Sequence, residues 1–309
     1  MIYTLTLNPV LDITVSTATL NRDEINRSSL KSVSAGGKGL NTSRALNCLG
    51  VRNTAIALCG GVFYNNIREF LSKEQINAHL INISGSTRVG IKIVEEQSQK
   101  LIELNEAGPA IKKGEVDTLL RYLKNMDPKP KYFVISGSLP QKIAPEIYCC
   151  IINLLKLEGI KTLLDASGEA LYHGMLALPE ILKINMREIC HVSEKYFKQE
   201  PQYVINEFLK KGIKMILITN GPEPVSFYNA GGKYSVISPD IKGPFKTGAG
   251  DSVNAGLIYS LLNDFEIEDL LKFSVACGNA NILSEVPGML DMDKVKEITG
   301  LVRVTRDQV

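Results

Sequence analysis

The stretch KYFVISGSLPQKIAPEIYCCIINLLKLEGIKTLLD (residues 131–165) decides the fold class. It begins with an apolar run, KYFVIS at 131–136, that is typical of a buried strand. A helical segment follows and ends at Gly159. Its predicted apolar stripe consists of Ile147, Cys150, Ile151, Leu154 and Leu155. The run KTLLD at 161–165 predicts the next strand, and this strand–helix–strand order favours a parallel sheet covered by helices on both faces.

The pattern continues with KMILIT at 214–219, a further predicted strand that ends at the turn-forming pair Asn220-Gly221. In a parallel sheet, ligands bind at the carboxyl ends of the strands. The polar residues at such ends are Ser136, Asp165, Asn185 and Thr219. We therefore expect an α/β protein whose functional site lies along this edge of the sheet.

Residues 10–33 and 86–105 contain β-like stretches without crossover helices. One of them, RVGIKIVEEQSQKLIEL (88–104), predicts a hairpin with a polar turn at 96–99. We interpret the two segments as a small second sheet that forms a lid on a single domain, residues 1–309. Because an exposed β-appendage leaves unpaired edges, we expect a homodimer that pairs two lids.

The composition is that of a globular protein, with 44% apolar and 22% charged residues among 309. The 35 Lys and Arg residues against 33 Asp and Glu residues give a net charge of +2, which predicts neither a nucleic-acid nor a membrane partner. No apolar run reaches the length of a membrane span, and the first residues lack the basic start of a signal peptide. We expect a cytoplasmic protein.

Six cysteines are scattered without a CxxC pair: Cys48, Cys59, Cys149, Cys150, Cys190 and Cys277. Most lie in apolar stretches, so we expect buried free thiols. The three histidines, His79, His173 and His191, are not spaced as zinc ligands.

A glycine-rich turn, Thr247-Gly248-Ala249-Gly250-Asp251, opens a predicted helix that we expect to start at Asp251 or Ser252. Gly248 and Gly250 allow a tight turn, which aims the free amides of the helix start at one point. Such a point attracts an anion, and an acidic side chain there can accept a proton during phosphoryl transfer. An Asp that only caps a helix gives the same pattern, so the motif alone leaves both interpretations open.

A second glycine-rich turn, AGGKGLN at 35–41, also opens a predicted helix. Its glycines favour close approach of a small polar ligand, with Lys38 and Asn41 as donors, over a flexible hairpin end. Neither turn matches a nucleotide fingerprint. Val253 replaces the third glycine of a dinucleotide motif, and Gly39 replaces the Ser or Thr of a P-loop.

Asn185 and Glu188 follow the strand-like run LPEIL at 178–182. Three residues apart on a helical turn, they share a face and can hold a hydrated magnesium ion. Similar pairs occur by chance on surface helices, so this pair decides nothing alone.

Together and in this order, these motifs resemble the ribokinase-like (PfkB-type) carbohydrate kinase family over essentially the whole chain. GGKGLN (36–41) is similar to the first family signature and KTGAGDSVNAG (246–256) to the second, while Asn185 and Glu188 match the NxxE element. TLTLNPVLD (4–12), SGSLP (136–140) and the hairpin of Arg88 resemble the phosphosugar branch, which holds 1-phosphofructokinases, tagatose-6-phosphate kinases and the minor 6-phosphofructokinases. The resemblance implies a three-layer α/β/α sandwich with a mostly parallel sheet and a small β-sheet lid.

The resemblance also implies residue roles. Asp251 takes the position of the catalytic base, next to an anion hole formed after Gly248 by the amides of Ala249, Gly250 and Asp251. The residues implied at the sugar are Asp12, Gly37, Lys38 and Asn41, and those implied at its phosphate are Arg88, Arg27, Lys38, Ser136 and Ser138.

For the nucleotide, the resemblance implies ATP and Mg²⁺ as cofactors. Lys183 and Asn185 are implied at the phosphates, Thr219, Gly221 and Asn279 at the ribose and adenine, and Glu188 with Asn185 at the metal. One departure from the branch pattern places Lys246 next to the anion hole, where it contacts nucleotide phosphate or solvent.

The sequence thus predicts an ATP-dependent kinase of a ketohexose phosphate, with fructose 1-phosphate the first candidate substrate and tagatose 6-phosphate the second. A 6-phosphofructokinase, a kinase of a neutral sugar or nucleoside and a sugar-phosphate sensor without turnover are the remaining alternatives. The presence of Arg88 disfavours the neutral-sugar kinase, and the presence of Asp251 disfavours the sensor.

Overall fold

The structure, a computed structural model, describes residues 1–98, 100–243 and 245–307. Its strands are β1 Ile2–Thr6, β2 Val10–Thr17, β3 Ser29–Gly36, β4 Asn53–Gly60, β5 Ala78–Ile83, β6 Arg88–Glu95, β7 Lys100–Asn105, β8 Tyr132–Ser136, β9 Lys161–Asp165, β10 Ile181–Asn185, β11 Met215–Asn220, β12 Glu223–Asn229, β13 Gly232–Ile237 and β14 Arg303–Arg306. Its helices are α1 Lys38–Cys48, α2 Tyr64–Lys73, α3 Lys113–Lys124, α4 Ile147–Leu157, α5 Gly168–Leu176, α6 Met186–Val192, α7 Pro201–Lys211, α8 Ala249–Leu262, α9 Ile267–Asn281 and α10 Met292–Thr299, with short helical turns at Gly61–Phe63 and Ser193–Phe197.

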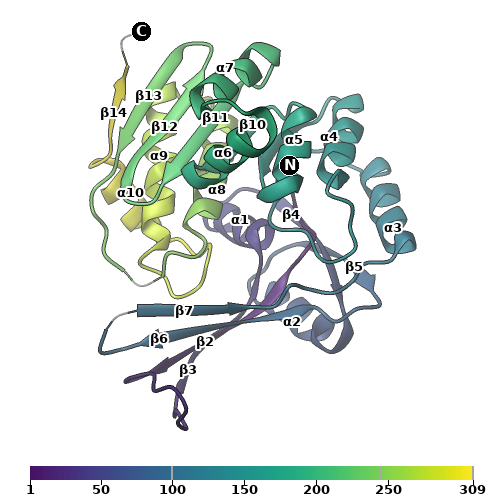
Figure 1. The fold of residues 1–309 in the computed structure, drawn as a ribbon, viewed down its shortest axis with the longest axis vertical. Coiled ribbons are helices and arrows are strands. Elements are labelled where there is room, and N and C mark those ends of the chain that lie inside the picture. Colours follow the sequence, from purple (N-terminus) through teal and green to yellow (C-terminus); the bar gives the residue numbers. More distant parts are fainter. Residues whose placement is uncertain (99, 244, 308–309) are drawn as a thin grey trace.

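Ten strands form a large, mostly parallel sheet in the order β14-β13-β12-β11-β10-β9-β8-β1-β4-β5 (Figure 1). Neighbouring strands from β11 to β5 are parallel, and β12, β13 and β14 extend the sheet by antiparallel pairing. The strands predicted at 131–136, 161–165 and 214–219 are confirmed as β8, β9 and β11. They run parallel within one sheet, so their carboxyl ends lie along the same edge.

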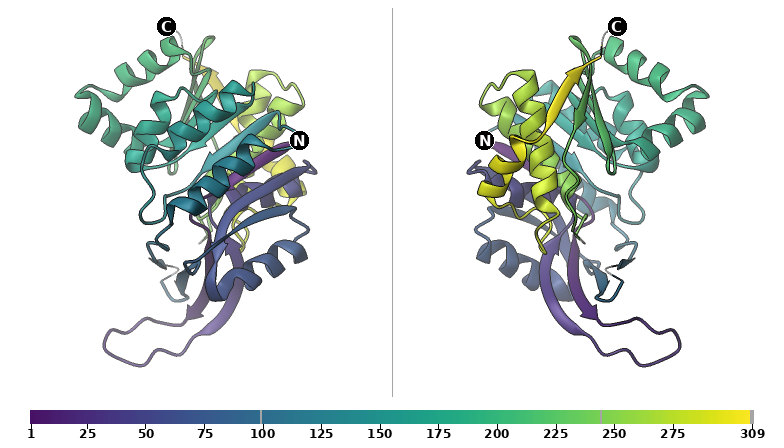
Figure 2. Two further views of the ribbon diagram at one scale, coloured as in Figure 1. Left: turned by 90° about the vertical axis from the view of Figure 1, so that its right-hand side faces the viewer. Right: turned by 90° about the vertical axis from the view of Figure 1, so that its left-hand side faces the viewer.

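Helices cover both faces of this sheet (Figure 2). On one face α3 to α7 pack on a core that includes Ile135 of β8, and on the other α1, α8, α9 and α10 pack on a core that includes Val134. Because both faces are covered, successive strand residues are buried alike, which explains the continuous apolar runs in the sequence. The expected three-layer sandwich is confirmed.

Four strands form the small sheet, in the order β3-β2-β6-β7. β2 pairs with β3 in antiparallel and with β6 in parallel orientation, and β6 and β7 form the expected hairpin. Of its predicted turn at 96–99, Gln99 lies outside the described residues. The sheet extends away from the main body, and the loop 18–28 projects furthest (Figure 2).

Two sequence-based expectations about burial are wrong. The buried face of α4 consists of Ile147, Tyr148, Ile151, Ile152 and Leu155, whereas Cys150 is exposed, because the helix is rotated toward Tyr148. All six cysteines are free as expected, but only Cys59 and Cys277 are buried. Within the described ranges, no helix combines the length and apolarity that a membrane crossing requires.

Candidate active site

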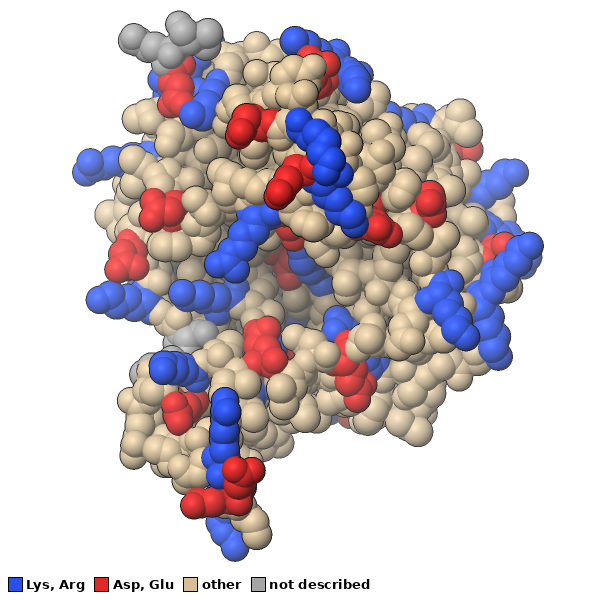
Figure 3. Space-filling model, viewed as in Figure 1, with Lys and Arg blue, Asp and Glu red and all other residues tan. Residues whose placement is uncertain are grey.

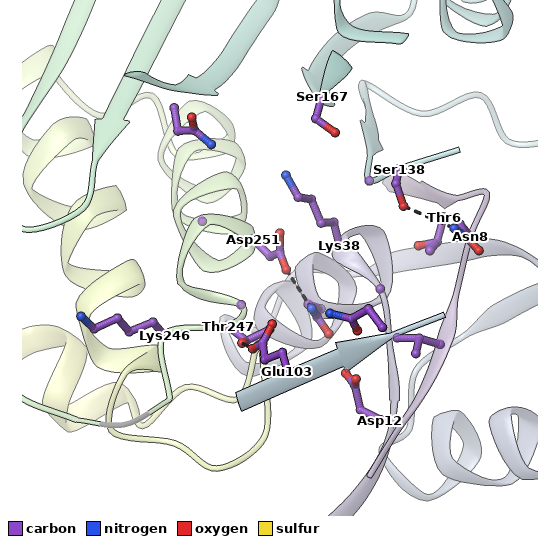
Figure 4. A pocket seen from close by; sticks show the side chains of 18 of the residues that line it. Thr6, Asn8, Asp12, Lys38, Glu103, Ser138, Ser167, Lys246, Thr247 and Asp251 are labelled. Atoms are coloured by element: carbon purple, nitrogen blue, oxygen red, sulfur yellow. Dashed lines mark hydrogen bonds between the residues drawn. The ribbon is translucent and has the colours of Figure 1, made fainter. Parts of the chain in front are cut away.

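A cavity of about 720 Å³ opens between the large and the small sheet (Figure 4). On the face shown in Figure 3 the surface is hollowed between the main body and the small sheet, and charged side chains of both signs border the hollow. Residues at the carboxyl ends of β10 and β11 line the cavity, as the sheet topology predicts. The predicted site residues that line it are Asp12, Gly37, Lys38, Asn41, Arg88, Ser138, Lys183, Asn185, Glu188, Thr219, Gly248, Gly250 and Asp251.

The start of α8 differs from the sequence-based expectation. Gly248 is the N-cap with a φ of 88°, a left-handed conformation that favours glycine, so the helix begins at Ala249 and already includes Asp251 in its first turn. The amide of Ala249 donates to the carbonyl of Lys246 at 3.3 Å. Within the described part of the chain, the amides of Gly250 and Asp251 have no acceptor, so two amides rather than the predicted three remain for an anion.

Asp251 is buried, and its Oδ2 accepts a hydrogen bond from Nδ2 of Asn41 at 2.8 Å (Figure 4). Burial raises the pKa of this carboxyl group to about 6, assisted by the negative charge of Asp165. Lys38, Asn41 and Lys183 oppose this rise. A carboxyl group with a pKa near 6 changes its protonation close to neutral pH, which suits acid–base chemistry.

A second carboxylate, Asp165 at the end of β9, holds the lysines of the site. Its oxygens accept from Lys38 at 2.6 Å, Lys183 at 3.0 Å and Nδ2 of Asn254 at 2.8 Å. Burial opposes the charge of Asp165, but the two lysines outweigh it and hold its pKa below the ordinary value. The position of Asp165 at a strand end was visible in the sequence, but its role as lysine partner was not, because the three donors come from distant segments.

The face of the small sheet toward the cavity carries Asp12 between two cations. Asp12 forms an ion pair of 3.0 Å with Lys92, and both side chains are buried. Gly90 lies directly opposite Asp12, and a Cβ there would approach Oδ1 of Asp12 to 2.7 Å. Burial raises the pKa of Asp12 even though Lys92 and Arg88 lower it. Lys92 was missed from the sequence, although it shares a strand face with Arg88 by period-two spacing.

Arg88 is held in place by main-chain acceptors. Its Nε and Nη2 donate to the carbonyl of Asn8 at 3.3 Å each, and its Nη1 donates to the carbonyl of Glu106 at 3.1 Å. Since guanidinium has five N–H groups, two remain for a ligand. Burial lowers the pKa of Arg88, with Asp12 and Glu106 opposing.

Asn185 and Glu188 form a capping box at the start of α6. Oδ1 of Asn185 accepts from the amide of Glu188 at 2.9 Å, and Oε2 of Glu188 accepts from the amide of Asn185 at 2.8 Å. The other carboxylate oxygen of Glu188 and Nδ2 of Asn185 are left for ligands in the cavity. The described residues contain no cluster of three or more His, Cys, Asp or Glu that could hold a metal ion.

Several predicted site residues do not line the cavity. Ser136 is fully buried at the end of β8, and the half-buried Ala249 is not among the lining residues. Arg27 is exposed on the loop between β2 and β3, Gly221 belongs to the turn after β11, and Asn279 lies on α9. Lining residues without a predicted role are Thr6, Asn8, Val10, Lys92, Glu103, Asn105, Gly137, Ser167 and Thr247, while Lys246 lines the cavity from an exposed position.

A parallel α/β sheet with a glycine-capped helix start, a buried carboxylate and lysines at one edge defines a phosphotransferase of the α/β class. Over residues 5–289 the chain matches the pfkB family of carbohydrate kinases, and it belongs to this family. It is 32% identical to a tagatose-6-phosphate kinase of Staphylococcus epidermidis, covering 98% of this chain and 99% of the relative. It is 31% identical to a 1-phosphofructokinase of Borreliella burgdorferi, covering 98% of each chain.

Among solved structures, phosphofructokinase-2 of Escherichia coli in complex with potassium superposes with a TM-score of 0.88 at 26% identity. The superposition covers 97% of this chain and 98% of the other. The expected ribokinase-like fold is therefore confirmed. Membership in this kinase family makes ATP a substrate.

Proposed function

We propose that the protein phosphorylates a ketohexose monophosphate, with fructose 1-phosphate as first candidate and fructose 1,6-bisphosphate as its product. One observation carries this proposal: the buried Asp251 shares its cavity with a small-sheet face on which Arg88 and Lys92 flank Asp12. A sugar phosphate offers hydroxyl groups for the carboxylates and a dianion for the cations. A neutral sugar would leave the two remaining N–H groups of Arg88 without an anionic acceptor.

In the proposed reaction, Asp251 takes the proton from the attacking sugar hydroxyl as that oxygen bonds to the γ-phosphorus of ATP and ADP leaves. The amides of Gly250 and Asp251 stabilise the negative charge of the transferring group. Lys38 and Lys183, which Asp165 holds at the same place, add two positive charges. The position of Lys38 beside Asp165 favours this role over contact with the substrate's own phosphate.

The sugar phosphate is proposed to bind on the small-sheet side. Asp12 accepts hydrogen bonds from sugar hydroxyls, and Gly37 and Asn41 line the sugar from the start of α1. The two remaining N–H groups of Arg88, with the hydroxyl of Ser138, bind the phosphate. Ser136 is fully buried at the end of β8 and does not line the cavity, so it has no contact with the phosphate in this proposal.

The nucleotide is proposed to bind on the large-sheet side. Lys183 and Nδ2 of Asn185 contact its phosphates, and Thr219 flanks the ribose. Gly221 and Asn279 lie outside the cavity and contact the adenine only if the nucleotide extends past the end of β11. Lys246 is exposed at the rim and is available to a terminal phosphate.

We also propose that Mg²⁺ accompanies ATP. The carboxylate oxygen of Glu188 that lies outside the capping box suits a hydrated ion bound mainly through nucleotide phosphates. Asn185 assists only through those phosphates, because its oxygen already accepts from Glu188 and its Nδ2 is a donor. When bound, the ion neutralises phosphate charge. One carboxylate from the protein suffices for such binding, because Mg²⁺ keeps several waters and needs only one or two carboxylates.

The small sheet is proposed to act as the lid of a homodimer. Its face opposite the cavity is apolar: Ile91 pairs with Leu104 and Ile93 with Ile102 across β6 and β7. Leu104 is 55% exposed in the single chain, and a second lid would cover it. Arg27, exposed on the projecting loop, reaches a substrate phosphate only from the partner's lid, so its predicted role depends on the dimer.

A coupled ADP-release assay with Mg-ATP tests the substrate. The panel contains fructose 1-phosphate, tagatose 6-phosphate, fructose 6-phosphate, fructose, ribose and adenosine. We expect turnover of fructose 1-phosphate with a kcat/KM at least tenfold above the others. Tagatose 6-phosphate is the second candidate because the Staphylococcus epidermidis relative is named for it. Turnover restricted to an unphosphorylated compound would contradict the proposal, and ligand binding without turnover would indicate a sensor.

A further inference from the structure

Arg44 is the largest fully buried side chain of the described residues, yet it lies on α1 only three residues from Asn41. Its carboxylate partner is Glu74, which follows α2: Nε donates to Oε2 at 2.8 Å and Nη2 to Oε1 at 3.1 Å. Nη2 also donates to the carbonyl of Ala35 at 2.7 Å. Nη1 donates to the carbonyl of Pro287 at 2.6 Å and to Oδ1 of Asn41 at 3.2 Å. These bonds use all five N–H groups of the guanidinium, so its orientation is fixed.

The bond to Asn41 determines which way the carboxamide of Asn41 points. Because its Oδ1 faces Arg44, its Nδ2 must face the other way, toward Oδ2 of Asp251 at 2.8 Å. A carboxamide turned by 180° would place its NH₂ group against the N–H groups of Arg44 and its oxygen against the carboxylate of Asp251, which is repulsive at both ends.

Arg44 also supports the turn beneath the start of α8. The carbonyl of Pro287 accepts from Arg44, and a Cβ at Gly248 would approach Cβ of Pro287 to 2.7 Å, so this turn touches the N-cap. Asn281 links the same two segments, since it donates to the carbonyl of Thr247 at 2.9 Å and accepts from the amide of Gly288 at 2.6 Å. The guanidinium of Arg44 therefore contacts both Asn41, the hydrogen-bond partner of Asp251, and Pro287, which packs against the start of α8.

We propose that Arg44 is a positioning residue for phosphoryl transfer: it orients the carboxamide of Asn41 so that an N–H faces Asp251, and thereby keeps this carboxylate ionised and aimed at the sugar hydroxyl. The proposal rests on the proposed role of Asp251 as base. Arg44 itself contacts neither substrate nor nucleotide, because it is buried beneath the cavity and does not line it.

The charged groups that face Asp251 are Lys38 on α1, Asp165 on β9 and Lys183 on β10. None of them is bonded to Arg44, so a change at position 44 acts on Asp251 through Asn41. A carboxylate that loses a hydrogen bond to its ionised form is harder to ionise. Release of the Asn41 carboxamide should therefore raise the pKa of Asp251 by about one unit.

The test compares Arg44→Lys with Arg44→Met by ¹³C NMR titration of aspartate carboxyl groups in the full-length protein, with the Asp251 signal assigned through Asp251→Asn. Lysine keeps the charge but offers three N–H donors, without a planar fork, in place of the five bonds that Arg44 makes to Glu74, Ala35, Pro287 and Asn41. We therefore expect it to leave the carboxamide of Asn41 unfixed, and both variants should raise the pKa of Asp251 equally. Asn41→Leu should give the same rise, and adding Arg44→Lys to it should give no further rise. A rise in Arg44→Met alone would mean that Arg44 acts by charge, which would overturn the proposal.

Leu46→Ala is the matched control for loosening of the helix. Leu46 is buried on α1 and belongs to the core on the other side of the helix, so its truncation lowers the melting temperature without touching Asn41. An equal pKa rise in Leu46→Ala would show that general loosening explains the effect and would refute positioning by Arg44.

The titration needs no turnover, so its result stands even if the substrate or base assignment is wrong. If the Asp251 pKa rises in the Arg44 variants and the acid limb of the kcat/KM profile moves with it, both proposals are supported. If the pKa rises but the acid limb stays in place, Arg44 still positions Asn41, and the base role of Asp251 is refuted.

Discussion

Two buried carboxylates close to each other have opposite pKa shifts, and their direct contacts explain why. Asp165 accepts hydrogen bonds from two lysines and stays ionised, whereas Asp251 accepts one from a neutral carboxamide and its pKa rises to about 6. Neighbouring acids with separated pKa values divide their roles. We interpret Asp165 as a permanently ionised residue that orients the two lysines. We interpret Asp251 as the residue that accepts and releases a proton.

Replacing Asp251 by Asn should remove the proton acceptor while keeping the shape of the cavity. Because ATP contacts other residues, its affinity should remain, and kcat should fall by about two to four orders of magnitude. Steady-state kinetics and calorimetric ATP binding measure the two effects separately. Turnover within tenfold of the parent enzyme would eliminate Asp251 as base.

The pH dependence of kcat/KM should report the same group. A base must be deprotonated to act, and the pKa of Asp251 is raised from 3.8 to about 6. Activity should therefore be full above this value and decrease tenfold per pH unit below it, with the bend near pH 6 rather than near pH 4. A bend near pH 4 would mean that Asp251 is solvated in the working enzyme.

Residues whose role depends on an unusual burial were not predictable from the sequence. Lys92 lies in an alternating strand and Arg44 on a helix, where a cation is usually exposed, and only the packing of distant segments buries them. Asp251, Asn41 and Arg88 were predictable because glycine turns, helix starts and the family signatures mark them. The lysine–carboxylate pairs required the three-dimensional structure, since each joins segments far apart in the chain.

At the level of elements, the strands were predicted well and one helix start was not. Continuous apolar runs mark β8, β9 and β11 because both faces of the sheet are covered. The start of α8 was placed two or more residues too late, because a glycine in left-handed conformation caps it in place of an acidic side chain.

The importance of this cap for the start of α8 can be tested by substituting Gly248. In Gly248→Ala the new Cβ would lie 2.7 Å from Cβ of Pro287 at a positive φ, so the turn must shift. We expect a destabilisation of about 1–3 kcal/mol, measured by denaturant unfolding, together with a loss of kcat of at least a hundredfold.

The control for this variant is Gly159→Ala. Gly159 has a φ of 70° at the end of α4 and no atom within 4 Å of the added Cβ, so it carries the backbone strain without the clash. It should lower stability by about 1–2 kcal/mol and leave kcat unchanged. Equal losses of activity in the two variants would show that general backbone strain, and not a displaced start of α8, lowers kcat.

The whole molecule has an apolar face on the small sheet that the single chain does not cover. Leu104 of β7 is 55% exposed on the face opposite the cavity, and Leu30 of β3 is 65% exposed.

If two lids pair, Leu104→Glu places a charge in the interface and should convert a dimer at micromolar concentration into a monomer, as sedimentation velocity would measure. Leu157→Glu is the control, because Leu157 is 86% exposed on α4 of the main body and should leave the dimer intact. A parent protein that sediments as a monomer with and without fructose 1-phosphate would refute the lid-paired dimer and, with it, any role for Arg27 at the substrate.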